Sequence, residues 1–194
     1  MNMTFFLSYC LMMTITPGPT NIMILSTVHH HGVSKALLFC YGTIVGFGIS
    51  LALAAFFNAL LSAFIPNIIV VMQWIGSLYM LYLAYQIATM DGKSGSKKEF
   101  GSFKKGFLLQ FVNPKVILFC LTVFPSFILP YHTTPVELMF FVLVITAIGA
   151  FSFFTWIFFG SLLARWMQHY RKSVNGIMAA FLVYTALIIS GIMN

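Results

Sequence analysis

Two short segments place helix-breaking prolines beside polar side chains in a chain that is otherwise strongly apolar. The first is TPGPTN at residues 16–21, and the second is NPK at residues 113–115. A proline inside a helix removes an N–H donor and clashes with the carbonyl four residues earlier. The freed carbonyl can accept from an ammonium group, and the N–H groups that begin the next helical segment suit a carboxylate. Together the two segments suit a small molecule that carries both groups.

The first segment is expected to break a helix at membrane depth. Pro17 and Pro19 free the carbonyls of Met13 and Ile15, and Gly18 between them lowers helix propensity further. Irregular backbone at such depth is tolerated only where protein or a water-filled cavity receives it. The alternative is a simple kink packed by neighbouring helices.

The second segment is expected to break another helix and to place a charge inside it. Pro114 frees the carbonyl of Gln110 and disfavours helical geometry at Asn113. Lys115 follows Lys105 by about ten residues, which is roughly 15 Å along a helix. An ammonium group there costs several kcal/mol unless it snorkels, pairs or meets water. Snorkelling to the cytoplasmic headgroups is the alternative to a place on a transport path.

These segments supply a hypothetical binding site midway through the membrane. Asn21 and Asn113 would bond the bound molecule or the unwound backbone, Lys115 would pair with a carboxylate, and Thr16 and Gln110 would add polar contacts. The breaks themselves would be shaped by four residues, which are Pro17, Gly18, Pro19 and Pro114.

The composition excludes an ordinary soluble domain. Of the 194 residues, 60% are hydrophobic and only 7% are charged, and the mean hydropathy is +0.98. In soluble domains about a quarter of all residues are charged. The elements that position the two segments must therefore be membrane helices, and the sequence predicts an all-α membrane protein.

The charges divide the chain into apolar runs that are long enough to span a bilayer, for which about 20 residues suffice. One of these runs, residues 36–90, holds two spans, because residues 64–67 carry a turn signal. Six spans are expected, at 4–28, 36–60, 68–89, 105–129, 137–160 and 174–193.

Orientation follows from the basic residues. Nine of the ten lie in alternate connections, at Lys35, at residues 93–105 and at residues 165–172. The positive-inside rule makes these connections cytoplasmic and puts both termini outside. The net charge of +7 reflects this asymmetry, so no nucleic-acid partner is needed to explain it.

The chain also shows a faint internal repeat. Residues 1–90 form one half, residues 91–104 a basic cytoplasmic loop, and residues 105–194 the second half, all within one transmembrane domain. Each half opens with a broken helix, and Gly46 matches Gly149. Three spans per half give the halves opposite orientation, so the two form inverted repeats with helices one and four broken. Paired broken helices in such halves indicate a midplane site of a secondary transporter.

The remaining reactive side chains predict neither a metal centre nor a cofactor. Three cysteines, Cys10, Cys40 and Cys120, fall inside expected spans and are interpreted as small packing residues. The run of His29, His30 and His31 is interpreted as interfacial and solvated, since adjacent helix residues point in different directions.

The acids restrict both the activity and the substrate. Asp91, Glu99 and Glu137 lie in or beside loops, so no carboxylate is expected at depth. A membrane enzyme would need an acid, base or nucleophile there, and none is predicted. A cationic substrate would need a counter-charge, so a neutral or anionic solute is favoured. A passive pore remains an alternative, and proton coupling lacks an obvious acidic carrier.

Four blocks of the chain resemble the LysE/RhtB amino-acid exporters. They are TPGPTN at 16–21, residues 26–32, WIGSLYMLYLAY at 74–85 and GFLLQFVNPK at 106–115. The resemblance covers nearly the whole chain. It implies a six-span protein of the bacterial inner membrane, built as an inverted repeat and often dimeric, that exports amino acids in exchange for protons.

One position departs from that family pattern. Many members carry an Asp after the glycine of span two, whereas here Phe47 follows Gly46. The departure argues against export of basic amino acids. The pattern is most similar to the branch of cysteine and O-acetylserine exporters, and homoserine, threonine or leucine remain as alternative substrates.

Overall fold

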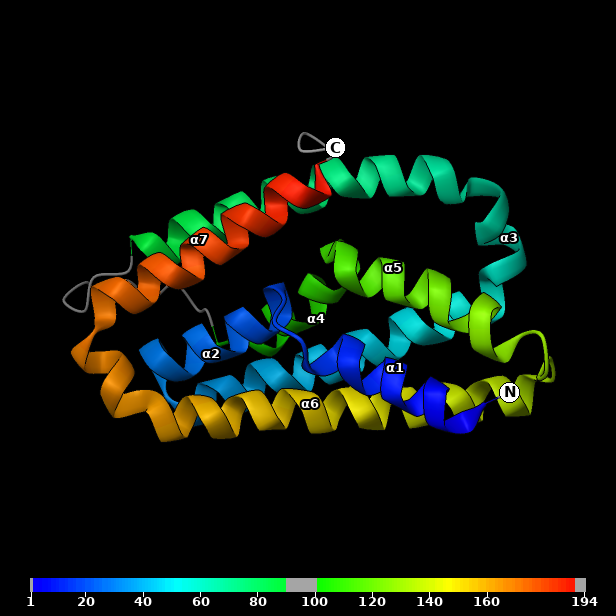
Figure 1. Cartoon of the computed structure of the whole chain (residues 1–194), viewed down its shortest axis with the longest axis horizontal. Coiled ribbons are helices and arrows are strands. Elements are labelled where there is room, and N and C mark those ends of the chain that lie inside the picture. The colour runs from blue at the N-terminus through cyan, green and yellow to red at the C-terminus, as the bar shows by residue number, and fades with distance from the viewer. Residues whose placement is uncertain (1, 90–100, 191–194) are drawn as a thin grey trace.

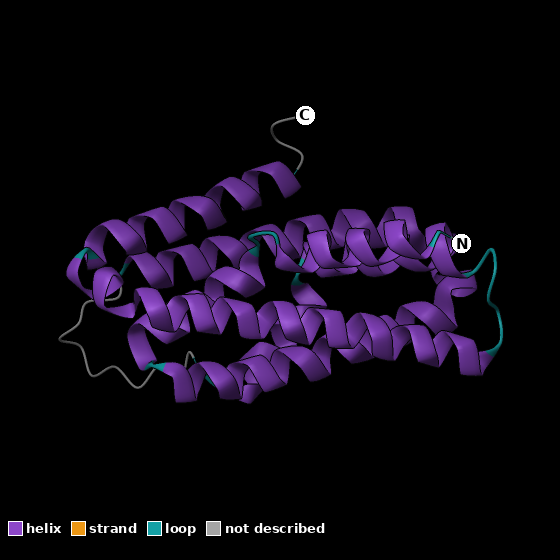
Figure 2. Cartoon of the chain, turned by 60° about the horizontal axis from the view of Figure 1, so that its bottom comes forward, coloured by secondary structure: helices purple, strands orange, loops and turns teal. Residues whose placement is uncertain are grey.

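The computed structural model describes residues 2–89 and 101–190, and it describes residues 58–73, 188 and 189 by their backbone alone. Every regular element in these ranges is helical, and short loops join the helices (Figure 2). The elements are α1 (Met3–Ile15), α2 (Pro19–His31), α3 (Val33–Ala88), α4 (Phe103–Val112), α5 (Pro114–Val123), the π-helical turn η1 (Phe124–Ile128), α6 (Pro135–His169) and α7 (Arg171–Ile189).

The two expected helix breaks are confirmed. The first expected span is divided into α1 and α2, with Gly18 extended at φ −168° and Pro19 opening α2. The fourth is divided at Asn113, where the backbone is also extended, and its two parts are bent by 61°. In both cases a proline begins the second helix, where its missing N–H costs no helical hydrogen bond.

The prediction that a turn at residues 64–67 ends one helix and begins another is wrong. The backbone is helical from Val33 to Ala88, and α3 bends back within this length (Figure 1). Its first part packs on α6 and its last part runs beside α7. A continuous helix keeps its backbone groups bonded through the reversal, which is favourable in a medium that offers no other partners.

Two described helices are long and apolar enough to cross a membrane, Val33–Phe57 and Pro135–His169, and the bent pair of α4 with α5 and η1 makes a third if it forms one span. α1 and α2 have 13 residues each, which is about 20 Å and short of the hydrocarbon thickness of about 30 Å. Only α1 and α2 together have the length of a membrane span.

The described basic residues gather where connections were expected to be cytoplasmic. Lys35 lies near the start of α3, Lys105 near the start of α4, and Arg171 and Lys172 begin α7. These three helix starts lie at one end of the molecule, opposite the N-terminus (Figure 1). Most of the expected basic loop, including Asp91 and Glu99, lies outside the described residues.

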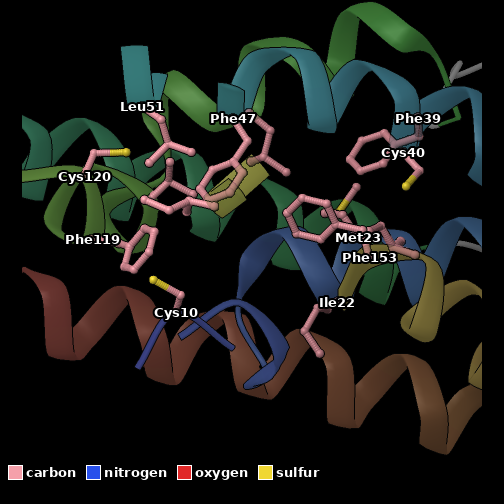
Figure 3. Close-up of a cluster of buried hydrophobic side chains, with 14 of the residues drawn as sticks. Cys10, Ile22, Met23, Phe39, Cys40, Phe47, Leu51, Phe119, Cys120 and Phe153 are labelled. Carbon is pink, nitrogen blue, oxygen red and sulfur yellow. The ribbon is translucent and has the colours of Figure 1, made fainter. Parts of the chain in front are cut away.

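A buried apolar cluster joins α1, α2, α3, α5 and α6 around the two breaks (Figure 3). Cys10, Cys40 and Cys120 are buried in it as free thiols, which confirms their interpretation as packing residues.

Candidate functional site

The carbonyls freed by the first break are bonded by side chains from other helices. The Trp156 indole on α6 donates to the Ile15 carbonyl at 3.0 Å. The Asn21 amide donates to the carbonyls of Thr14 at 3.0 Å and Thr16 at 2.9 Å. The break is therefore stabilised by specific bonds, as irregular backbone within a membrane requires.

Lys115 reaches from α5 to the end of α1. Its ammonium group donates to the Thr16 carbonyl and the Thr16 hydroxyl, both at 2.8 Å, and lies 3.5 Å from the Pro17 carbonyl. A Cβ on Gly18 would lie 3.0 Å from Lys115 Cδ, so the lysine stem lies across this glycine. The side chain thus joins the two breaks.

Asn113 caps α5 and connects it to α2. Its Oδ1 accepts from the Lys115 backbone N–H at 3.1 Å, which is an N-cap bond. Its Nδ2 donates to the Thr20 hydroxyl at 2.8 Å. Gln110 donates to the same hydroxyl at 3.3 Å and to the Gly106 carbonyl. Thr20, at the start of α2, is therefore the point where the first broken helix meets α4 and the break of the second.

Two acceptor atoms beside this junction have no partner in the described structure. They are Asn21 Oδ1 and Gln110 Oε1, and both side chains are at least 98% buried. In addition, no side chain caps the start of α2. Buried polar groups without partners are uncommon in folded proteins, so these atoms indicate where a bound molecule or water completes the hydrogen bonding.

A pocket opens between the two breaks and contains about 350 Å³ of empty space, part of it open to solvent. Its polar lining comes from Thr14, Thr20, Asn21, Asn113 and Lys115. Lys115 is the only charged residue among the described residues that line it. Glu137 pairs with His132 at 2.9 Å at the start of α6, so no described carboxylate neutralises the pocket.

The opposite wall of the pocket is aromatic. Phe47 from α3 stacks on Phe119 from α5, with ring centroids 6.0 Å apart, and meets Phe153 from α6 edge-on (Figure 3). A Cβ on Gly149 would lie 2.6 Å from the Phe47 ring, so this glycine makes room for it. The wall suits the apolar part of a small ligand.

The sequence-predicted residues thus converge on one place. Gly18, Asn21, Asn113 and Lys115 line the pocket, and Gln110 stands behind Thr20. Thr16 and Pro17 hold the lysine, and the prolines that open α2 and α5 set the breaks. Sequence reasoning did not include Thr14, Thr20, Trp156 or the aromatic wall. Thr20 gave a signal through its place between Pro19 and Asn21, and Phe47 gave one through its place after Gly46.

The histidine run is solvated only in part: His31 is exposed as expected, whereas His29 is buried and His30 is half-buried. His29 is 5% exposed, and His30 accepts from Arg171 at 3.1 Å through Nδ1 and bonds Asn175 at 3.0 Å through Nε2. Burial, with the charges of His29 and Arg171, lowers the pKa of His30 to about 4. For His29 and His30 the prediction failed because Arg171 and Asn175 on α7 close over this end of α2, a contact that residues 29–31 alone do not indicate.

The chain is similar to known proteins over nearly all its length. A family model for the LysE type translocator matches residues 11–190. The chain is 38% identical over 183 residues to a cysteine/O-acetylserine efflux protein of Klebsiella pneumoniae, covering 94% of this chain and 93% of the relative. Proteins of the same name from Salmonella choleraesuis and Escherichia coli K12 are 34% and 33% identical, with 94% of each chain covered. No solved structure matches.

The family match and these relatives include both helix breaks and the pocket between them. The chain therefore belongs to the family of LysE type translocators, which makes it an amino-acid exporter of the membrane.

Proposed function

We propose that the protein exports a small neutral amino acid, such as cysteine or O-acetylserine, from the cytoplasm by antiport with protons. The observation that carries this proposal is the pocket between the two helix breaks, where Lys115 is the one charged lining residue described. The names of the relatives support the substrate.

The carboxylate of the substrate would bind beside Lys115. The uncapped start of α2 lies at the same place, since Gly18 and Thr20 both line the pocket. A lysine ammonium and a helix N-terminus both favour an anion. The absence of a described carboxylate in the lining removes any competing negative charge.

The side chain of the substrate would lie against the aromatic wall of Phe47, Phe119 and Phe153. This wall offers no counter-charge, and a cationic side chain buried against it would lose its hydration without a partner. A small neutral side chain is therefore favoured. The same wall also accepts homoserine, threonine or leucine, which remain the alternative substrates.

The architecture that we propose is six spans in two inverted repeats, with the breaks of α1/α2 and α4/α5 at the midplane. In this arrangement the basic helix starts face the cytoplasm of a bacterial inner membrane, and both termini face outside. Transport would proceed by alternating access around the pocket. A homodimer in the lipid bilayer is the proposed assembly.

Export is tested in cells that overproduce the protein and are assayed for excretion of each amino acid. Cysteine or O-acetylserine is expected in the medium. Lys115→Met and Pro114→Ala, at equal abundance in the membrane, should reduce export about tenfold or more, which corresponds to about 1.4 kcal/mol. Lys172→Met is the matched control, since this lysine is exposed at the start of α7. Unchanged export in both site variants would show that the site is wrong.

A passive pore is separated from a carrier by measurements on vesicles. A proton antiporter loses concentrative efflux when the pH gradient is collapsed, whereas a pore continues to equilibrate the solute. Efflux that ignores the gradient would contradict proton antiport. Excretion of no amino acid at all would contradict the exporter itself.

A further inference from the structure

The oxygen atoms that surround the Lys115 ammonium could bind any primary ammonium group. The three surrounding oxygens are the Thr16 carbonyl, the Thr16 hydroxyl and the Pro17 carbonyl, at 2.8, 2.8 and 3.5 Å. A primary ammonium carries three donors, and the carbonyl end of a helix attracts positive charge. We call these three atoms the oxygen cage.

The oxygen cage adjoins the pocket. Lys115 crosses Gly18 to reach the cage, with Nζ 3.3 Å from the place of a Gly18 Cβ, and both residues line the pocket. Thr16 and Pro17 are themselves exposed. A molecule in the pocket therefore lies within reach of the cage, and the lysine stem covers the approach to it.

The α-ammonium of an amino acid and the lysine ammonium are the same chemical group. The cage has room for one, because two ammonium ions about 3 Å apart repel strongly wherever water is scarce. A bound amino acid that places its ammonium in the cage must displace Lys115. The displaced ammonium then needs a new partner, and the substrate brings one into the pocket as its own carboxylate.

We infer that Lys115 is a built-in competitor of the substrate ammonium: it occupies the oxygen cage while the pocket is empty, and exchanges the cage for the substrate carboxylate when an amino acid binds. This inference rests on the proposed function for the identity of the substrate. It assigns the cage as the ammonium subsite and gives Lys115 two successive partners.

The exchange explains selection for zwitterions. An amine without a carboxylate displaces Lys115 and leaves it without an anion, so its binding is opposed by the desolvated lysine. A carboxylic acid without an ammonium can draw Lys115 away only by leaving the cage oxygens unpaired. Only a molecule with both groups satisfies every partner.

The exchange is tested by measuring the affinity of the purified protein for three thiols, in detergent and under reducing conditions. They are cysteine, cysteamine, which lacks the carboxylate, and 3-mercaptopropionate, which lacks the ammonium. Removal of the competitor in Lys115→Met should tighten cysteamine binding about tenfold, equal to about 1.4 kcal/mol, and should weaken 3-mercaptopropionate binding by a similar factor. Lys172→Met should change neither.

A second pair of variants locates the amine and guards against misfolding. Lys115→Gln keeps an N–H donor for the cage while it removes the charge, and it should also tighten cysteamine binding. Adding Thr16→Val to Lys115→Met removes the hydroxyl of the cage and should reverse part of the gain. Cysteamine binding that is equal or weaker in both Lys115 variants overturns the inference.

The outcomes separate the inference from the proposed function. Wild-type protein that binds and exports cysteine, with no gain in cysteamine binding in the variants, refutes the competition and leaves the exporter intact. Wild-type protein that neither binds nor exports any amino acid refutes both.

Discussion

At the scale of single residues, the site depends on side chains that each bond a backbone or hydroxyl group of another helix. Trp156, Asn21 and Lys115 bond the carbonyls of the first break. Asn113 both caps α5 and holds Thr20. Each of these side chains therefore has a structural role that can be measured apart from transport.

Trp156→Phe should lower stability because it leaves the half-buried Ile15 carbonyl without its donor. The expected loss is about 1–3 kcal/mol, measured as thermal unfolding in detergent. Trp166→Phe is the matched control, since Trp166 is 55% exposed, and it should stay within about 0.5 kcal/mol of the wild type. Equal effects in the two variants would contradict the role of the indole N–H.

Asn113 allows stability and transport to be separated. Asn113→Ala removes the cap and should cost about 0.5–2 kcal/mol. Asn113→Asp keeps a capping oxygen and should remain near wild-type stability, but its carboxylate competes with the substrate for Lys115 and no longer donates to Thr20. Export should fall about tenfold in both. Wild-type export by the Asp variant would show that the pocket lining is misassigned.

At the scale of elements, the site requires that α4 lie very close to α3. A Cβ on Gly106 would collide with the Phe39 carbonyl oxygen, and one on Gly42 would collide with the Phe103 carbonyl oxygen. Small residues permit such backbone contact between membrane helices. The contact places Gln110, one turn after Gly106, behind Thr20.

Gly106→Ala should therefore force α4 away from α3 and destabilise the protein. An overpacked contact costs about 1–3 kcal/mol, and export should fall with it. Gly176→Ala on α7 is the matched control, because nothing lies within 4 Å of its Cβ position. This control should be neutral or gain up to about 1 kcal/mol from helix propensity. Thermal unfolding of the two variants in parallel checks the difference.

The breaks were predictable from sequence because a proline acts on its own helix. Pro17, Pro19 and Pro114 remove local donors whatever surrounds them. Asn21 was expected to bond the unwound backbone and does so at Thr14 and Thr16. The distant partners were not predictable, since Lys115 lies 99 residues from Thr16 and Trp156 lies 141 residues from Ile15. The continuity of α3 through residues 64–67 was also missed, because a turn signal is local while a bend depends on packing.

At the scale of the whole molecule, the described basic helix starts cluster at one end and the breaks lie between the ends (Figure 1). The long helix α6 exposes large apolar side chains such as Phe151 and Phe158, each 63% exposed. Such a surface suits lipid, and as a LysE type translocator the protein is an integral membrane protein. The basic end also carries the buried contact between α2 and α7.

That contact predicts a pH dependence of stability. His30 takes up a proton below about pH 6.5 when unfolded, but burial lowers its folded pKa to about 4. Between these values the unfolded state binds more protons, so stability falls as the pH is lowered through this window and is retained above it. Thermal unfolding measured from pH 7 to pH 4 should show this loss, and His30→Gln should reduce its slope. An unchanged slope in the variant would contradict the assignment.

The bonds across the first break also constrain the order in which the protein is assembled. The chain is synthesised from its N-terminus, so the carbonyls of Ile15 and Thr16 emerge before Lys115 and Trp156, which follow 99 and 141 residues later. At about 5–20 residues per second this delay lasts roughly 5–30 s. During that interval Asn21, which lies five residues after Thr16, can already bond the Thr16 carbonyl, whereas the Ile15 carbonyl must accept from water or from the insertion machinery. The hydrogen bonding of the first break is therefore complete only after the second half of the chain has arrived.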